Sequence, residues 1–286
     1  MLEVSNIKVY DLEESIIAAS YAMLTDNSDV DNRIKNLRFW FNLGDDFLIK
    51  FYHYIKSNPD FKYKLLENNM VSVKDDEGNS VRILDMQVPC IFGKDWKIIK
   101  ENNTIYVDES FVFYSPLDNE TYMYNLKQAV KDIDRIIKLS NTPQGSGHRN
   151  AIKGIRVSFD IKYPNYISPE LQRYHFLDII SSSSKMHKLS KMDMNVCFNK
   201  YVSKEIIDII KSYVQKYNEN PTYENFMKLL SNCPQGIELF MRCSTNYEQL
   251  ATIYKQRKTH KLKEDWGAFC NFIENLPLAK ELITNV

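Results

Sequence analysis

Apolar residues recur every three or four positions through most of the second half of the chain, and this spacing constrains the fold more than any other feature. It predicts a series of helices at 204–218, 222–232, 234–244, 246–258 and 264–276. Further helices are expected at 12–24, 47–57, 124–140 and 168–183. Strict alternation at 155–163 predicts a strand, and a shorter strand is expected at 5–10.

From residue 60 to 120 the helical spacing of apolar residues gives way to alternation. Two alternating apolar segments flank the polar run 75–79, and a second pair flanks 101–103, which is typical of hairpins. About four strands are expected here. We therefore predict an α/β (α+β) fold in which residues 1–286 form a single domain, with an inserted helix and β-rich lobe at about 25–120 and a core at 121–286.

Composition narrows the function classes. The chain has 37 Lys+Arg and 37 Asp+Glu, so no net charge favours binding to a nucleic acid or an anionic membrane. Its 8 glycines form neither a dinucleotide-binding nor a P-loop motif. No signal peptide, membrane span or paired-cysteine metal motif is recognised. A cytoplasmic protein without a metal site is expected.

The segment 147–188 carries the residues most suited to chemistry. It contains a Gly-His loop, a strand, and then a run of four serines that ends one residue before Lys185. Hydroxyls, free backbone N–H groups and flanking cations together favour a phosphate site. A solvated serine-rich turn is the alternative, since such turns are common on protein surfaces.

Two parts of the sequence resemble one family. RYHFLDIISSSSKM, at 173–186, resembles the motif RHRxxSxNxxSxRY of the flavin-dependent thymidylate synthases, and Gly147-His148 and Val157-Ser158-Phe159 precede it at matching positions. NYEQLATIYKQR, at 246–257, is similar to that family's late helix. The resemblance covers about 10–23 and 125–260. It implies a thymidylate-synthase-complementing-protein-like fold with a helix-rich C-terminal half and a nucleotide-site core at 121–286.

The resemblance also implies site residues. As catalytic residues it implies Ser183 and Arg257. As substrate-binding residues it implies Arg173, Ser183, Lys185 and Arg257, and neighbouring Glu170 is a further candidate. As flavin-binding residues it implies Ser20, His148, Arg173, His175 and Asn246.

Several motif positions differ from the family. Tyr174 and His175 replace a His and an Arg that help to hold the flavin, and Glu248 replaces a flavin-contacting Arg. Asp178 and Ile180 replace the motif Ser and Asn. The substitution of Glu248 for a cation places a like charge where flavin phosphates would lie.

The resemblance implies a methyltransferase of nucleotide biosynthesis. It would act on a pyrimidine deoxynucleotide such as dUMP, with FAD, methylenetetrahydrofolate and a homotetrameric assembly. A related modification of the nucleotide base is another option. The alternative is a protein that kept the fold and the nucleotide pocket but lost flavin and catalysis. Binding of flavin distinguishes these functions.

Overall fold

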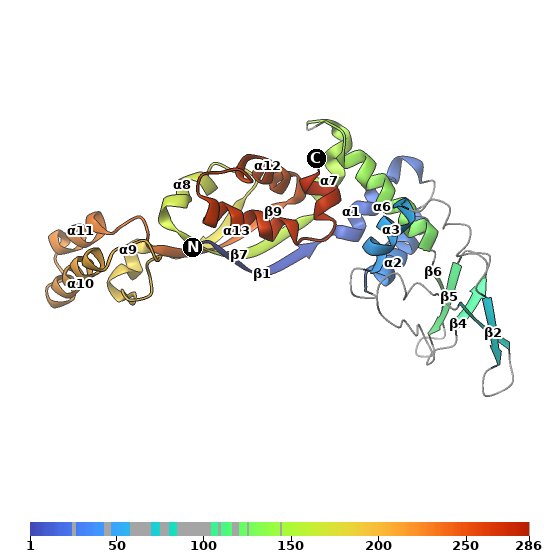
Figure 1. Ribbon diagram of the computed structural model, residues 1–286, viewed down its shortest axis with the longest axis horizontal. Coiled ribbons are helices and arrows are strands. Elements are labelled where there is room, and N and C mark those ends of the chain that lie inside the picture. The colour runs from blue at the N-terminus through green and yellow to red at the C-terminus, as the bar shows by residue number, and fades with distance from the viewer. Residues whose placement is uncertain are drawn as a thin grey trace. The chain divides into compact units, whose positions relative to one another are not determined.

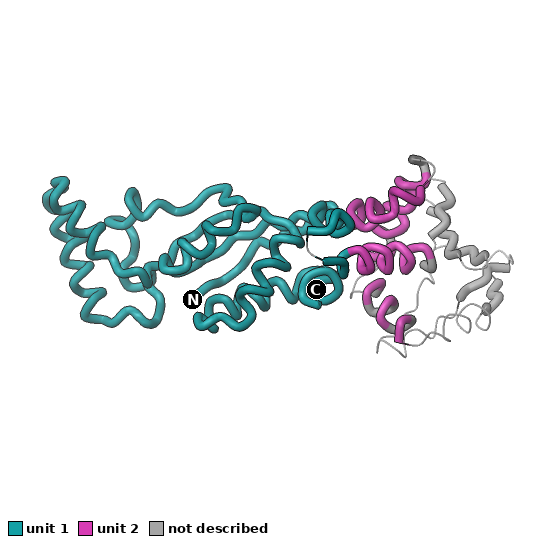
Figure 2. The backbone as a smooth tube through the Cα atoms, turned by 90° about the horizontal axis from the view of Figure 1, so that it is seen from above, with its two compact units in different colours: residues 1–12, 140–286 teal, residues 13–139 magenta. Residues whose placement is uncertain are grey.

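The computed structural model describes residues 1–24, 27–42, 47–57, 70–74, 80–84, 104–107, 110–115, 120–124, 126–143 and 145–285. The chain divides into two compact units (Figure 2). Unit 1 comprises residues 1–12 and 140–286, and unit 2 comprises residues 13–139. The lobe and core boundaries expected from the sequence remain predictions.

A four-stranded antiparallel sheet forms the centre of unit 1. Its strand order is β1 (Glu3–Tyr10), β7 (Arg156–Pro164), β9 (Glu238–Asn246) and β8 (Asp178–Ser182). The chain is therefore a mixture of helices and antiparallel sheet. The strand predicted at 155–163 is confirmed as β7, and the one predicted at 5–10 lies within β1.

The alternation in β7 explains how the sheet is covered. Val157, Phe159 and Ile161 point to one face and are buried, because helices α12 (Tyr247–Arg257) and α13 (Lys263–Glu274) pack there (Figure 1). Apolar burial of this kind is the main driving force for such a layer. The opposite face is much more exposed, and on it Phe240 has 57% of its surface accessible.

Helices α10 (Lys204–Glu219) and α11 (Tyr223–Asn232) pack against each other within the connection from β8 to β9 (Figure 1). The other helices of unit 1 are short. They are α7 (Ala151–Gly154), α8 (Ser168–Leu171), α9 (Lys185–Lys188), three 3-10 turns (Gly147–Asn150, Asn165–Ile167 and Leu189–Lys191) and the π-helix Lys280–Thr284.

Two predicted helices are wrong. The segment 168–183 forms only the short helix α8, then a turn and the edge strand β8. The segment 234–244 leads into β9, a central strand of the sheet. In both cases long-range pairing with a neighbouring strand overrides the local helix preference.

Unit 2 holds helices around its own apolar core. They are α1 (Leu12–Ala18), α2 (Asn27–Asn42), α3 (Phe47–Ser57), most of α6 (Leu126–Ser140) and the 3-10 turn Tyr21–Met23. The side chains of Ile16, Leu37 and Ile133 have no exposed surface. Among its described residues there are also five strands. Strand β2 (Met70–Lys74) pairs with β3 (Ser80–Leu84), and β4 (Thr104–Val107), β5 (Ser110–Ser115) and β6 (Glu120–Tyr124) form a second sheet.

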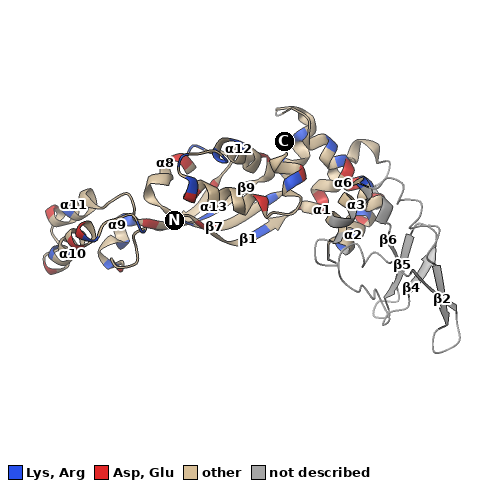
Figure 3. Cartoon of the chain, viewed as in Figure 1, with Lys and Arg blue, Asp and Glu red and all other residues tan. Residues whose placement is uncertain are grey.

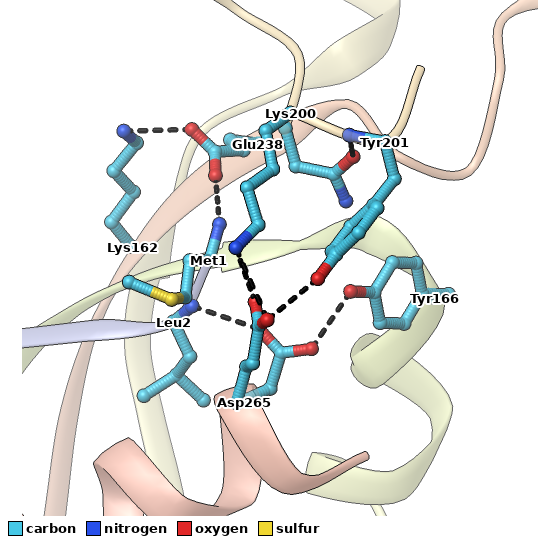
Figure 4. Close-up of polar contacts among 10 residues, drawn as sticks. Met1, Leu2, Lys162, Tyr166, Lys200, Tyr201, Glu238 and Asp265 are labelled. Carbon is cyan, nitrogen blue, oxygen red and sulfur yellow. Dashed lines mark hydrogen bonds and ion pairs between the residues drawn. The ribbon is translucent and has the colours of Figure 1, made fainter. Parts of the chain in front are cut away.

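A polar network ties the start of β1 to β9 and α13 (Figure 4). The N–H of Leu2 donates to Asp265 Oδ1 at 2.9 Å, and Tyr166 Oη donates to Asp265 Oδ2 at 2.7 Å. Glu238 accepts from the Met1 amino group and from Lys162 Nζ, the latter at 2.7 Å. The pKa of Glu238 is below its usual value: burial opposes ionisation, but these two cations outweigh burial.

Glu238 should therefore make the fold sensitive to acid. A lowered pKa means that the carboxylate stabilises the fold above the ordinary glutamate pKa of about 4.3 and loses this effect as pH falls through the folded-state pKa. We expect Glu238→Gln to reduce the free energy of unfolding at pH 7, and the difference from the wild type to shrink by pH 3. Urea denaturation at both pH values measures this. A difference that does not depend on pH would contradict the assignment, and Glu219→Gln, at an exposed residue hydrogen-bonded to neutral Gln215, is the control.

Candidate functional site

Two segments that are far apart in the sequence meet at Arg257, the last residue of α12. Arg257 Nη1 donates to Glu170 Oε2 of α8 at 3.0 Å, and Arg257 Nε donates to Tyr174 Oη at 2.7 Å. Tyr174 Oη in turn donates to Gln256 Oε1 at 3.0 Å. The structure thus brings two of the predicted substrate residues, Glu170 and Arg257, into direct contact.

Aromatic and imidazole groups complete this cluster. The guanidinium carbon of Arg257 lies 4.3 Å from the centre of the Trp266 ring, a cation–π distance. Trp266 Nε1 donates to Glu170 Oε2 at 2.8 Å. His260 Nε2 lies 3.7 Å from Glu170 Oε1. We call Glu170, Tyr174, Arg257, His260 and Trp266 the Arg257 cluster.

The cluster is partly accessible to solvent. The side chain of Arg257 is 12% exposed and that of Glu170 is 26% exposed, so their charges attract each other more strongly than on an open surface. Burial raises the pKa of Tyr174, although the hydrogen bond from Arg257 works in the opposite direction. The phenol is therefore a neutral acceptor and donor near pH 7.

One guanidinium nitrogen of Arg257 is uncommitted. Nε and Nη1 make the contacts above, while Nη2 makes no hydrogen bond to any residue that the structure describes. A guanidinium carries five N–H donors in a rigid planar fork. The cluster can therefore offer a donor from Arg257 beside an acceptor, Glu170 Oε1, to a polar ligand.

Ser183 has a structural contact of its own. Its N–H donates to the Phe240 carbonyl at 2.8 Å, and its Oγ accepts from the Phe240 N–H at 3.0 Å, which extends the pairing of β8 with β9. Lys185, half-buried, begins α9, where Ser184 Oγ accepts from the His187 N–H. Among the described residues, no hydrogen bond or ion pair joins Ser183 or Lys185 to the Arg257 cluster.

Three of the predicted ligand residues lie on the surface. Arg173 and His175 are exposed in the turn between α8 and β8, and His148 is exposed in the 3-10 turn Gly147–Asn150. No side chain of the described residues forms an ion pair or hydrogen bond with any of these three side chains. Their positive or ionisable groups are available to a ligand in solution.

The remaining flavin positions are engaged in internal contacts. Asn246 caps α12, since its Oδ1 accepts from the Gln249 N–H at 3.0 Å. Glu248 Oε2 accepts from Arg149 Nε at 3.0 Å and from Arg149 Nη2 at 2.8 Å. Arg149 is 2% exposed and also donates to the carbonyl of Ser140. Glu248, 13% exposed, therefore forms an ion pair with a buried arginine.

These residues do not by themselves fit a flavin. Asn246 and Glu248 hold the first turn of α12, and Glu248 keeps a negative charge at one of the expected positions. Ser20 is 1% exposed and lies in unit 2, where its N–H donates to the carbonyl of Ile17. We assign no reaction step to a flavin on this arrangement.

Sequence reasoning missed three residues of this region. Arg149, Trp266 and His260 were assigned no role, yet the first anchors α12 and the other two contact the Arg257 pair. His260 lies in the turn that follows α12, three residues after Arg257, and no sequence pattern marked it. Nothing in the local sequence marks Arg149 as buried.

Charge elsewhere is evenly mixed. Basic and acidic residues are interspersed along the described helices (Figure 3). In the part of the chain that the structure describes, no three His, Cys, Asp or Glu side chains are placed to hold a metal ion. None of the described helices is long and apolar enough to cross a bilayer.

Comparisons with known proteins return similarity at the level of structure only. No protein-family model matches the chain, and no curated protein matches it. Among solved structures, the flavin-dependent thymidylate synthase ThyX from Helicobacter pylori in complex with FAD and dUMP matches with a TM-score of 0.45 and 17% identity, over 54% of this chain and 83% of that chain. A second crystal structure of ThyX from the same organism, with the same two ligands, gives a TM-score of 0.43 and 16% identity, over 54% and 82%. At this level the similarity describes about half of the chain and does not establish what the chain does.

Proposed function

We propose that the chain binds a pyrimidine deoxynucleotide, such as dUMP, at the Arg257 cluster. The observation that carries this proposal is the contact between Glu170 and Arg257. Arg257 ends the segment 246–257, Glu170 lies just before the segment 173–186, and both are expected substrate-binding residues. Their direct contact at 3.0 Å allows one part of a small ligand to meet both side chains.

The chemistry of the cluster supports the same function. Nucleotide bases present donors and acceptors on one edge, and a planar guanidinium beside a carboxylate matches such an edge. Arg173, His175 and Lys185 are cations or ionisable groups in the segment that follows Glu170, and they suit the nucleotide phosphate. The cluster supports binding without requiring a covalent step.

Calorimetry with dUMP tests the proposal. We expect Arg257→Gln to weaken dUMP binding by at least about tenfold, because a hydrogen bond to a charged group contributes about 1.5–3 kcal/mol. Arg242→Gln is the matched control: Arg242 pairs with Asp160 on the open face of the sheet, away from the Arg257 cluster. Circular dichroism verifies that both variants fold. Equal affinity in the wild type and in Arg257→Gln, or no dUMP binding by the folded wild type, would refute the proposal.

A visible spectrum decides between binding and catalysis. A folded protein that binds dUMP and ignores added FAD is a nucleotide-binding protein. A flavin spectrum that shifts when dUMP is added would instead support flavin-dependent modification of the nucleotide, the other function that the sequence resemblance implies. Turnover that depends on methylenetetrahydrofolate would then identify the one-carbon donor.

A further inference from the structure

The Arg257 cluster contains an arginine whose charge is already balanced. Glu170 Oε2 accepts from Arg257 Nη1 at 3.0 Å and from Trp266 Nε1 at 2.8 Å. Arg257 and Glu170 together carry no net charge. An arginine that serves as a phosphate clamp is usually left with an excess of positive charge for the anion to neutralise.

The imidazole of His260 lies beside the same carboxylate. His260 Nδ1 accepts from the Leu262 N–H at 3.2 Å, so the hydrogen of the neutral ring lies on Nε2, which faces Glu170 Oε1. The Glu170 carboxylate therefore faces both Arg257 and His260.

We propose that Glu170 is a specificity-determining residue that excludes anions from Arg257 and restricts this position to a neutral polar group of the ligand. This rests on the proposed function in one respect: in a nucleotide, the neutral group is the base edge and not the phosphate. An anion that approaches Nη2 meets the carboxylate of Glu170 beside it, and like charges in a partly buried site repel strongly. A neutral carbonyl meets no such penalty.

Two hydrogen bonds hold the Glu170 carboxylate in the position from which it repels anions. Its carboxylate is held by two donors from different helices, Arg257 of α12 and Trp266 of α13, so it cannot swing aside without leaving the buried Trp266 N–H unpaired. An unpaired buried donor costs about 1–3 kcal/mol. The side chain of residue 170 therefore sets the charge of the group that Arg257 accepts.

The test uses inorganic phosphate at pH 8 as the probe. Glu170→Gln keeps an oxygen acceptor for Arg257 and Trp266 but removes the negative charge. We expect this variant to bind phosphate at least about tenfold more tightly than the wild type, measured by calorimetry, and to melt at a higher temperature in phosphate than in chloride of equal ionic strength. Because each protein is compared with itself in two salts, a general loss of stability does not imitate this result.

Three further variants test where the phosphate binds and whether the charge of residue 170 causes the gain. The double variant Glu170→Gln/Arg257→Gln should lose the gain, which places the phosphate at Arg257. Glu170→Asp keeps the charge and should show no gain, and Glu224→Gln, at the exposed pair with Lys228 on α11, should also show none. A phosphate response in Glu170→Gln no larger than that of the wild type would overturn the proposal.

A separate measurement covers the case in which Glu170→Gln does not fold. Arg257→Gln alone should leave the weak phosphate response of the wild type unchanged, because no anion binds at Arg257 while Glu170 is present. Loss of that response in Arg257→Gln would overturn the proposal. Inorganic phosphate contains no base, so this outcome is independent of dUMP binding. A gain in phosphate affinity without any dUMP binding would refute the proposed function and leave the role of Glu170 standing.

Discussion

Replacing Arg149 by methionine should destabilise unit 1 by about 3–5 kcal/mol, the usual cost of removing one partner from a buried ion pair. Arg149 is 2% exposed, and its loss removes the guanidinium that pairs with the Glu248 carboxylate and also donates to the Ser140 carbonyl. The buried charge that remains accounts for most of the expected loss. Urea denaturation followed by circular dichroism measures it.

Two comparisons isolate this effect. Lys228→Met removes an exposed ion pair of α11 and should cost less than about 1 kcal/mol, because solvent screens such pairs. The double variant Arg149→Met/Glu248→Met removes both charges and should be less destabilised than Arg149→Met alone. A loss near that of Lys228→Met would show that the Arg149 pair is not buried in solution.

Replacing Phe159 by alanine should cost a similar amount, about 3–5 kcal/mol, through a different mechanism. The ring of Phe159 has no exposed surface and lies 4.8 Å from the Phe272 ring and 5.8 Å from the Phe269 ring, measured between centres. Its removal creates a cavity between β7 and α13 in addition to the lost burial of apolar surface. The midpoint of urea denaturation should fall with little change in slope.

The opposite face of the same sheet supplies the control. Phe240 of β9 is 57% exposed, so Phe240→Ala should change the free energy of unfolding by no more than about 0.5 kcal/mol. Equal losses in Phe159→Ala and Phe240→Ala would mean that the exposed face is covered in solution. That result would call for a measurement of the oligomeric state.

The sequence predicts well those helices and strands that bury one regular apolar face against the rest of the protein. The helices expected at 47–57, 204–218 and 222–232 are confirmed within a few residues as α3, α10 and α11. The alternation of β7 is equally clear, because every second side chain is fully buried under α13 and α12. Local periodicity is sufficient in these cases.

The two wrong helices fail for different reasons. In β9, Leu239, Met241 and Cys243 alternate as a strand requires, but the apolar Phe240 on the exposed face and the helix-favouring Leu and Met hide the period. In β8 all five residues are exposed, so burial imposes neither a helical nor a strand period on its apolar residues. Its strand conformation comes from pairing with β9, which no local pattern reveals.

The candidate site shows the same limit. Glu170 and Arg257 were both expected to bind the substrate, and the structure places them 3.0 Å apart. It could not indicate that Glu248 faces Arg149, since these residues are brought together only when α12 folds back on the Gly147–Asn150 turn. Contacts between distant segments require the fold to be known.

The strand order β1–β7–β9–β8 has a consequence for the time course of folding. Strand β1 pairs with β7 only after residues 11–155 have been made, and β8 pairs with β9 only after residues 183–237. Closing loops of this length is entropically unfavourable, and folds rich in such long-range pairs form slowly. On the ribosome, the whole of unit 2 is made after β1 and before its neighbour in the sheet, β7. A chain interrupted before residue 238 would leave β7 exposed along the edge meant for β9, an unprotected strand edge of the kind that promotes aggregation.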